Sequence, residues 1–336
     1  MYRVESLCHA QPIARPYRLR IATLTLLALA LPGALPGHFP GVTVSAQTVT
    51  TTNPYKGVEH KQVSVTAGQS INNRAHSYHA LVIDLTAPGL SFKTSPGNGA
   101  ATGDVLTQRT LNFVNQENAQ IGINANFFAF SSASQFFGTP YNTTLTGAAA
   151  SNGNAVSNFE PSHPNALNIS EGNVGTFITT GTSGTVNNTQ GIPLHNAIGF
   201  NGPGLLINNG GANPSAGDAT AAYPGVSLTN DQRLILLASS SISHREMIAA
   251  FQFLAGDTTG LYGHFLDGGG STSLYLRNPD TDAVQALVGS TRLVGNSLVV
   301  FAQPVPEPGT ALLLVVGASV LGLRRRKVSV AVLNRQ

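Results

Sequence analysis

Apolar and polar positions along the chain follow mostly the period of a β-strand. Val63 and Val65 alternate with polar residues, and the apolar run at residues 80–85 is closed by a Pro-Gly pair. Alternation with period two, and short apolar runs bounded by Gly or Pro, predict strands. The same reading predicts further strands at residues 121–130, 166–169, 176–179, 195–200, 234–237 and 291–301.

Helical spacing is confined to two segments. Residues 107–116 indicate a short helix, and a second begins at Ser243, where Ser243 and Glu246 form a Ser-x-x-Glu capping box. Apolar residues follow at helical spacing until Gly256 ends the helix. Glu246 therefore has a structural role as a cap, which we weigh against a catalytic one.

The pattern predicts one α+β domain that is rich in β-structure, with a mixed sheet at its core and few helices. Residues 131–220 are rich in Gly, Asn, Ser and Thr, a composition typical of hairpins and long loops. With 42% hydrophobic and 10% charged residues, the chain is globular rather than disordered.

Residues 262–276 carry the strongest chemical signal. One apolar run ends at Asp267, three glycines and two hydroxyl residues follow, and a second apolar run begins. Glycines let backbone N–H groups approach an anionic or hydroxyl-rich ligand. The residues of interest are Asp267, Gly268, Gly269, Gly270, Ser271 and Thr272. The alternative is a glycine-rich hairpin whose aspartate caps its own turn.

A second signal is a pair of amides, Asn124 and Asn126, with period two inside an apolar strand. Buried amides need hydrogen-bond partners, so they either face a polar pocket or fix the neighbouring backbone. Both alternatives stay open.

Four blocks in order resemble the phosphodiester glycosidase family: LDGGGSTS at 266–273, INANFF at 123–128, HNAIG at 195–199 and VGNSLVV at 294–300. The resemblance covers residues 63–301 and implies hydrolysis of a glycosyl-phosphodiester, with Asn124, Asn126, His195, Asn196 and Asn296 at the substrate. The family usually has Arg-Thr at positions 195 and 196, so a bidentate phosphate contact is replaced here by an imidazole.

The resemblance implies that Asp267 handles the sugar hydroxyls or the proton transfer, with Glu246 as a second candidate, while the glycine amides, Ser271 and Thr272 hold the phosphate. A phosphodiester leaving group is a weak base, which lowers the demand for a general acid. A secreted carbohydrate-binding protein without turnover is the alternative. A metal centre would need a cluster such as His76, His79 and Asp84, which is more typical of solvated surface; we expect neither a metal nor a cofactor.

The basic character of the chain belongs to its two ends, and the segment between them is net acidic. A nucleic-acid partner, which would need a basic face on the folded domain, is therefore not expected. Cys8, the only cysteine, lies near the N-terminus, so cofactor sites built on cysteine are excluded.

Both ends of the chain carry patterns typical of targeting signals. An arginine patch, an apolar run at residues 21–31 and a small-residue site before Gln47 predict a secretory signal at 1–46, with an uncleaved anchor as the alternative. Residues 304–327, with VPEPG at 305–309, an apolar stretch at 311–323 and RRRK at 324–327, resemble the bacterial PEP-CTERM sorting signal. That resemblance implies cleavage by an exosortase, with a permanent membrane segment as the alternative.

These segments divide the chain into a signal at 1–46, a linker at 47–62, the glycosidase-like domain at 63–303, the sorting signal at 304–327 and a tail at 328–336. The expected location is the cell envelope or the extracellular space, and the expected partners are the substrate glycan, a signal peptidase and an exosortase.

Overall fold

The computed structural model describes residues 47–179, 192–202 and 204–305. The predicted secretory signal, the apolar stretch at 311–323 and its basic cluster lie outside these residues. Within them, no helix is long and apolar enough to cross a membrane.

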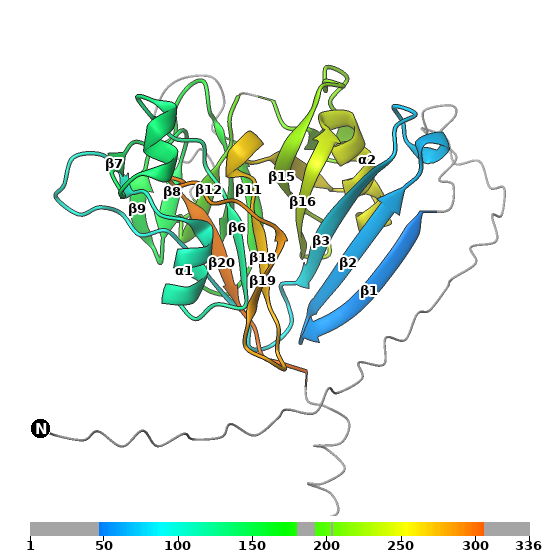
Figure 1. Ribbon diagram of the computed structural model, residues 1–336, viewed down its shortest axis with the longest axis horizontal. Helices are drawn as coiled ribbons and strands as arrows, with labels where there is room; N and C mark the ends of the chain where they lie inside the picture. The colour runs from blue at the N-terminus through cyan, green and yellow to red at the C-terminus, as the bar shows by residue number, and fades with distance from the viewer. Residues whose placement is uncertain (1–46, 180–191, 203, 306–336) are drawn as a thin grey trace, which may run out of the picture. The chain divides into compact units, whose positions relative to one another are not determined.

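The described residues form three larger sheets and one two-stranded pair (Figure 1). The eight-stranded sheet has the order β1 (Thr48–Tyr55), β2 (Val58–Val65), β3 (His76–Asp84), β16 (Arg233–Ser243), β15 (Thr220–Leu228), β17 (Tyr262–Phe265), β13 (Ile207–Asn208) and β14 (Gly211–Ala212). One five-stranded sheet has the order β19 (Val284–Val288), β18 (Leu274–Arg277), β6 (Ile121–Asn124), β20 (Ser297–Phe301) and β4 (Ser91–Thr94).

The other five-stranded sheet has the order β11 (Gly175–Thr179), β10 (Asn165–Ile169), β12 (Asn196–Gly199), β8 (Ala149–Ser151) and β9 (Asn154–Ser157). β5 (Val105–Leu106) pairs with β7 (Asn142–Thr143). The helices are α1 (Thr110–Gln116) and α2 (His244–Ala255), with 3₁₀ turns η1 (Ala67–Gln69), η2 (Ala133–Phe137) and η3 (Gly269–Ser271).

The predicted β-rich domain with few helices is confirmed, but the predicted mixed sheet is wrong. Every strand pairing among the described residues is antiparallel. Parallel neighbours need long crossover connections, usually helical, and between residues 47 and 303 the sequence shows helical spacing in only two segments.

The segment expected to be a linker at 47–62 forms β1 and most of β2. β1 pairs with β2 from Thr48 opposite Ser64 to Tyr55 opposite Val58. Its run of threonines lacks a period-two apolar pattern because it lies at the exposed edge of the sheet, but β-branched residues favour extended backbone.

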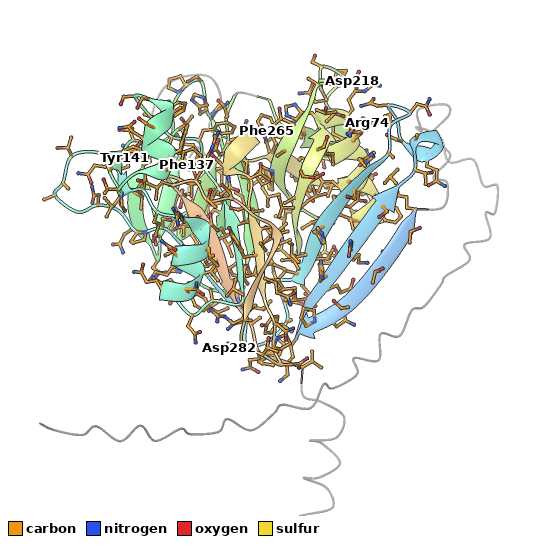
Figure 2. The ribbon with its side chains drawn as sticks, viewed as in Figure 1. Arg74, Phe137, Tyr141, Asp218, Phe265 and Asp282 are labelled. Carbon is orange, nitrogen blue, oxygen red and sulfur yellow. The ribbon has the colours of Figure 1, made fainter. Side chains whose placement is uncertain are left out.

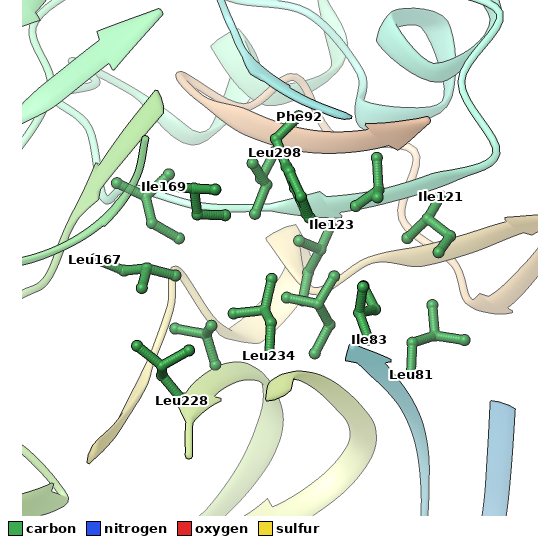
Figure 3. Close-up of a cluster of buried hydrophobic side chains, with 14 of the residues drawn as sticks. Leu81, Ile83, Phe92, Ile121, Ile123, Leu167, Ile169, Leu228, Leu234 and Leu298 are labelled. Carbon is green, nitrogen blue, oxygen red and sulfur yellow. The ribbon is translucent and has the colours of Figure 1, made fainter. Parts of the chain in front are cut away.

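Strand β16 shows how the eight-stranded sheet is buried on both faces. Leu234 and Leu236 belong to the central hydrophobic cluster, whereas Ile235 and Leu237 pack with residues of α2 such as Phe251. This alternation follows from the period of two along a strand. The central cluster joins side chains from all three sheets, including Leu81, Ile123, Leu167 and Leu298 (Figure 3).

Candidate active site

The glycine turn connects two different sheets. β17 leads into Asp267 from the eight-stranded sheet, and β18 leaves Ser273 in a five-stranded sheet. The expected alternative, a hairpin between paired strands, is therefore not what forms. In a hairpin, the two strands would pair with each other within one sheet. Here the chain crosses from one sheet to another, so the turn lies at the boundary between the two sheets.

One backbone hydrogen bond and two bonds of a side-chain amide fix the turn to the end of β6. The Asp267 N–H donates to the Ala125 carbonyl at 2.9 Å. The Asn124 side-chain amide donates to the Asp267 carbonyl at 2.6 Å and accepts from the Ser273 N–H at 2.8 Å. Asn124 thus determines where Asp267 lies, the role of fixing backbone that one of our two alternatives described.

The Asp267 carboxyl group is nearly enclosed and incompletely hydrogen-bonded. The residue is 9% exposed, and its Oδ2 atom is buried without a hydrogen-bond partner among the described residues. Burial raises the pKa of Asp267 from 3.8 to about 7, although the Ser271 hydroxyl and the charge of Arg292 act to lower it. Perturbed carboxyl groups of this kind are concentrated at functional sites.

The three glycines present free backbone donors at the surface. None of the Gly268, Gly269 and Gly270 N–H groups has an acceptor in the described part of the chain, and Gly269 and Gly270 are exposed. Gly269 has φ = 63°, the left-handed conformation that favours glycine and that occurs in backbone anion-binding nests. The Thr272 hydroxyl is also buried, and no other described residue forms a hydrogen bond with it.

Arg292 supplies a cation beside this turn, and the sequence did not identify it as a site residue. A Cβ at Gly270 would collide with the Arg292 guanidinium, so the absent side chain lets the cation lie against the turn. The guanidinium lies over the Phe136 ring at 4.5 Å and 5.8 Å from the Phe137 ring centroid. Within the described residues the guanidinium makes no hydrogen bond and no salt bridge, although its charge acts on the Asp267 carboxyl group.

An aromatic cluster borders the turn at Gly268. Tyr223 packs against Gly268, and His244 stacks on Phe265 at 4.2 Å while contacting Tyr223 at 4.7 Å. Phe127 meets Phe265 edge-on. These rings are half-buried. Their separation along the chain gives no local pattern, so sequence reasoning missed them.

The remaining predicted asparagines are buried and fully engaged. Asn126 donates to the carbonyls of Thr146 and Ala148 at 3.0 and 3.2 Å and accepts from the Asn296 amide at 2.8 Å. Asn296 in turn accepts from the Ser95 N–H at 3.1 Å. Asn126 and Asn296 therefore lie in one network with the strand ends that surround the turn.

Asn196 and His195 are placed differently. The Asn196 amide donates to the Phe92 carbonyl at 2.9 Å and joins β12 to β4. The His195 ring lies near Gly153, and the backbone N–H of His195 donates to the Asn168 side-chain oxygen at 2.8 Å. No described contact joins His195 to the glycine turn, so its role in the pocket stays a prediction.

Glu246 forms the predicted capping box and also binds two residues outside α2. It accepts from the Ser243 N–H at 2.8 Å, from Arg74 at 2.6 Å and from Ser70 at 3.0 Å. Burial alone would raise the pKa of Glu246, but these hydrogen bonds and the charge of His76 lower it overall. Its carboxylate is occupied in holding the N-terminus of α2.

His76 and His79, two of the three residues considered for a metal centre, lie apart in the structure. His76 contacts Glu246 at 3.5 Å, whereas His79 stacks on His60. Positions three apart on a strand point to opposite faces, which separates His76 from His79. Among the described residues, no group of three His, Cys, Asp or Glu could hold a metal ion.

The turn lies at the surface of the domain, with Gly269 and Gly270 exposed and Asp267 buried. Two hollows of about 340 and 600 Å³ are lined by other residues, the first around Asn208 and Asn213 and the second around Tyr55 and Arg233, and neither reaches Asp267. A ligand would therefore approach Asp267 over the exposed glycines, with the buried carboxyl group below it. Figure 2 shows Phe265 and Phe137 at the end of the domain opposite Asp282.

The chain matches solved structures of three proteins, two of them with a TM-score above 0.5 that shows a similar fold. The catalytic domain of zebrafish N-acetylglucosamine-1-phosphodiester alpha-N-acetylglucosaminidase, auto-inhibited by its pro-peptide, has 15% identity and a TM-score of 0.52, with 76% of this chain and 89% of that one covered. An exported protein of Burkholderia pseudomallei has 11% identity and a TM-score of 0.52, with 81% and 100% covered. A hypothetical protein from Synechocystis has 17% identity and a TM-score of 0.49, and the match covers 77% of this chain but only 64% of that one.

No curated protein sequence matches the chain. The family model of phosphodiester glycosidases matches residues 117–301, more than half of the chain, and includes the glycine turn, the asparagine network and Arg292. The chain therefore belongs to the phosphodiester glycosidase family.

Proposed function

We propose that this protein hydrolyses a glycosyl-phosphodiester at the Asp267 turn and releases the sugar. The observation that carries this proposal is the pairing of a carboxyl group whose pKa is about 7 with an arginine that has no acceptor among the described residues, both at one glycine turn. Family membership supports the same chemistry.

The phosphate is held by Arg292 and the glycine amides. A guanidinium offers a planar fork of donors that matches phosphate oxygens. Stacking on Phe136 orients that fork before the substrate arrives. The N–H groups of Gly268, Gly269 and Gly270 complete the anion site. Arg292 supplies the positive charge that the family usually has as an arginine at position 195, where this chain has a histidine.

Asp267 serves as the base. Hydrolysis breaks the bond between the anomeric carbon and the phosphoryl oxygen, and that oxygen keeps the electron pair. A phosphomonoester is a good leaving group without protonation, so the remaining demand is removal of a proton from the attacking water. Ionised Asp267 accepts that proton, and the water oxygen becomes the anomeric hydroxyl of the product.

The buried amides act by positioning. Asn124 holds the Asp267 carbonyl and the Ser273 N–H, while Asn126 and Asn296 hold the surrounding strand ends. Every side-chain amide bond described for them goes to protein groups. Their contribution is therefore a fixed turn geometry, which a catalytic carboxyl group requires.

The first substrate to test is a phosphodiester of N-acetylglucosamine 1-phosphate, the linkage in the name of the zebrafish relative. With the full-length chain, we expect release of free sugar. Asp267→Asn should lower kcat at least about 100-fold, because a positioned acid or base contributes 10²–10⁴-fold. A colorimetric assay of released sugar measures both.

Circular dichroism of Asp267→Asn serves as the folding control. An Asp267→Asn variant that keeps full activity would remove Asp267 from the mechanism. Binding of the sugar phosphodiester without release by the wild-type chain would favour the alternative of a carbohydrate-binding protein.

We also propose that the chain is exported, with residues 1–46 removed and the segment from 304 onward serving as a sorting signal. The sequence patterns at both ends support this proposal. The intact mass of protein recovered from the cell envelope or the medium checks both cuts, and an uncut mass at either end would contradict the corresponding step.

A further inference from the structure

Two exposed phenylalanines lie beside the proposed phosphate site. Phe130 is 54% exposed and Phe137 is 59% exposed. Together with Phe136 they form what we call the phenylalanine lip, which flanks and includes the turn η2. The Arg292 guanidinium lies between the glycine turn and this lip, because it contacts Gly270 and also stacks on Phe136.

The lip is a fixed surface. Phe136 is buried in a cluster with Phe128, Leu145 and Val294. The Ser131 N–H donates to Gln135 at 2.7 Å, and the Leu293 N–H donates to the Phe136 carbonyl at 2.8 Å. The two exposed rings are thus carried by an ordered segment.

The shape of the lip fits a flexible hydrocarbon chain better than a flat ring. Phe130 is inclined to Phe136 by 52° and to Phe128 by 58°, and Phe128 is inclined to Phe136 by 89°. No two of these rings form the parallel slot that would hold a nucleobase. An alkyl chain can follow such a surface, because contact with apolar area does not depend on direction.

Several polar groups of the segment that carries the lip are engaged with one another. The Ser132 and Ser134 hydroxyls share a hydrogen bond at 2.8 Å, and Gln135 accepts from the Ser131 and Ser132 N–H groups. A sugar ring stacked on a phenylalanine also needs partners for its hydroxyls, and the Ser132 and Ser134 hydroxyls and the Gln135 carbonyl oxygen are already occupied.

We propose that the phenylalanine lip binds the hydrocarbon chain of a lipid aglycone, so that the substrate class is a sugar linked through a phosphodiester to a lipid. This inference rests on the proposed function for the placement of the phosphate at Arg292. The Phe137 ring centroid is 5.8 Å from the guanidinium carbon, so the first methylenes beyond a bound phosphate reach the lip.

The first test compares two esters of N-acetylglucosamine 1-phosphate, methyl and decyl, with the full-length protein and at concentrations where the decyl ester is monomeric. We expect kcat/KM to be about tenfold higher for the decyl ester, since several buried methylenes contribute to its binding. Equal values of kcat/KM for the two esters would overturn the inference.

Variants separate apolar contact from ring stacking. Phe137→Ser should bring the decyl-to-methyl ratio close to one, whereas Phe137→Leu should keep most of it because the surface stays apolar. The control is Val174→Ser, a valine that is 54% exposed on the connection between β10 and β11, which should leave the ratio unchanged. Loss of the ratio in Phe137→Leu, or an unchanged ratio in the Phe130→Ser/Phe137→Ser double variant, would contradict a lipid site.

A binding measurement separates this inference from the proposed function. Calorimetry with decyl phosphate and with inorganic phosphate needs no turnover. We expect decyl phosphate to bind about tenfold more tightly, and Phe137→Ser to abolish the difference. That result supports the lip even if neither ester is hydrolysed, an outcome that would refute the proposed function alone. Equal affinities in the wild-type protein would refute the lip.

Discussion

At Asp267, burial and charge act on one carboxyl group in opposite directions. Burial raises its pKa, and Arg292 with the Ser271 hydroxyl holds the increase to a value of about 7. A carboxyl group with a pKa of about 7 is ionised in about half of the molecules at neutral pH, so it can serve as a base. A deeper site without Arg292 would keep it protonated.

The pH dependence of hydrolysis follows from that pKa. If Asp267 must be ionised, kcat/KM rises with pH through an apparent pKa of about 7. Arg292→Met removes the nearby positive charge, so this limb should move to higher pH, and loss of the phosphate contact should lower kcat/KM at least about tenfold. The measurement is kcat/KM from pH 5 to 9.

The control for this prediction is Arg245→Met, an exposed arginine of α2 that pairs with Asp218 at 3.2 Å. It should leave the profile unchanged. If the apparent pKa of the kcat/KM profile is unchanged in Arg292→Met, the guanidinium does not act on the catalytic carboxyl group.

Among the elements, α2 was the most predictable and its cap the most instructive. Ser243, the apolar spacing and Gly256 specified a helix from His244 to Ala255. The local pattern did not predict that Glu246 also accepts hydrogen bonds from Arg74 and Ser70. These bonds connect the loop before β3 to the helix. The cap is therefore also a tertiary contact.

Glu246→Gln should destabilise the fold by about 2 kcal/mol, because Arg74 loses a buried partner while the amide keeps part of the capping geometry. The rate of hydrolysis should stay within about twofold of the wild-type rate, because Glu246 caps α2 and is not part of the proposed catalytic group. Urea unfolding and the sugar-release assay measure the two effects. Glu59→Gln, at an exposed surface pair with Lys61, is the matched control and should change stability by less than about 0.5 kcal/mol.

A Glu246→Gln variant with unchanged stability and no hydrolysis would restore the catalytic alternative. The sign of the pH effect gives a second check. Because the pKa of Glu246 is lowered in the folded state, its stabilising contribution is present above the unfolded pKa and is lost as the pH falls through the folded pKa.

For the whole molecule, the C-terminal end of β1 lies beside the last described residues. Tyr55 bridges Pro304, and the Lys56 N–H donates to the Gln303 carbonyl at 2.9 Å. β1 and β2 extend the sheet that carries β17 and the approach to Asp267. The folding unit therefore begins before residue 63, where the sequence pattern placed its start.

This arrangement predicts the result of two truncations. Residues 47–305 alone should unfold in one transition, with a Tm within about 2 °C of the full chain, because the described pairings lie inside this range. Residues 63–305 lose β1 and most of β2 and leave β3 unpaired on one side, so their Tm should fall by more than about 10 °C. Thermal circular dichroism compares them, and equal Tm values would mean that β1 and β2 are dispensable.

The sequence alone determined what neighbouring residues specify: the α2 helix with its start and end, most of the strands, and a glycine turn after Asp267. Such features depend on propensities and hydrogen bonds within a few residues. Only the tertiary structure decided that β17 and β18 belong to different sheets, that Asn124 fixes Asp267 143 positions away, and that Arg292 lies against Gly270. These depend on long-range packing and burial, which also raise the pKa of Asp267, and no local pattern encodes them.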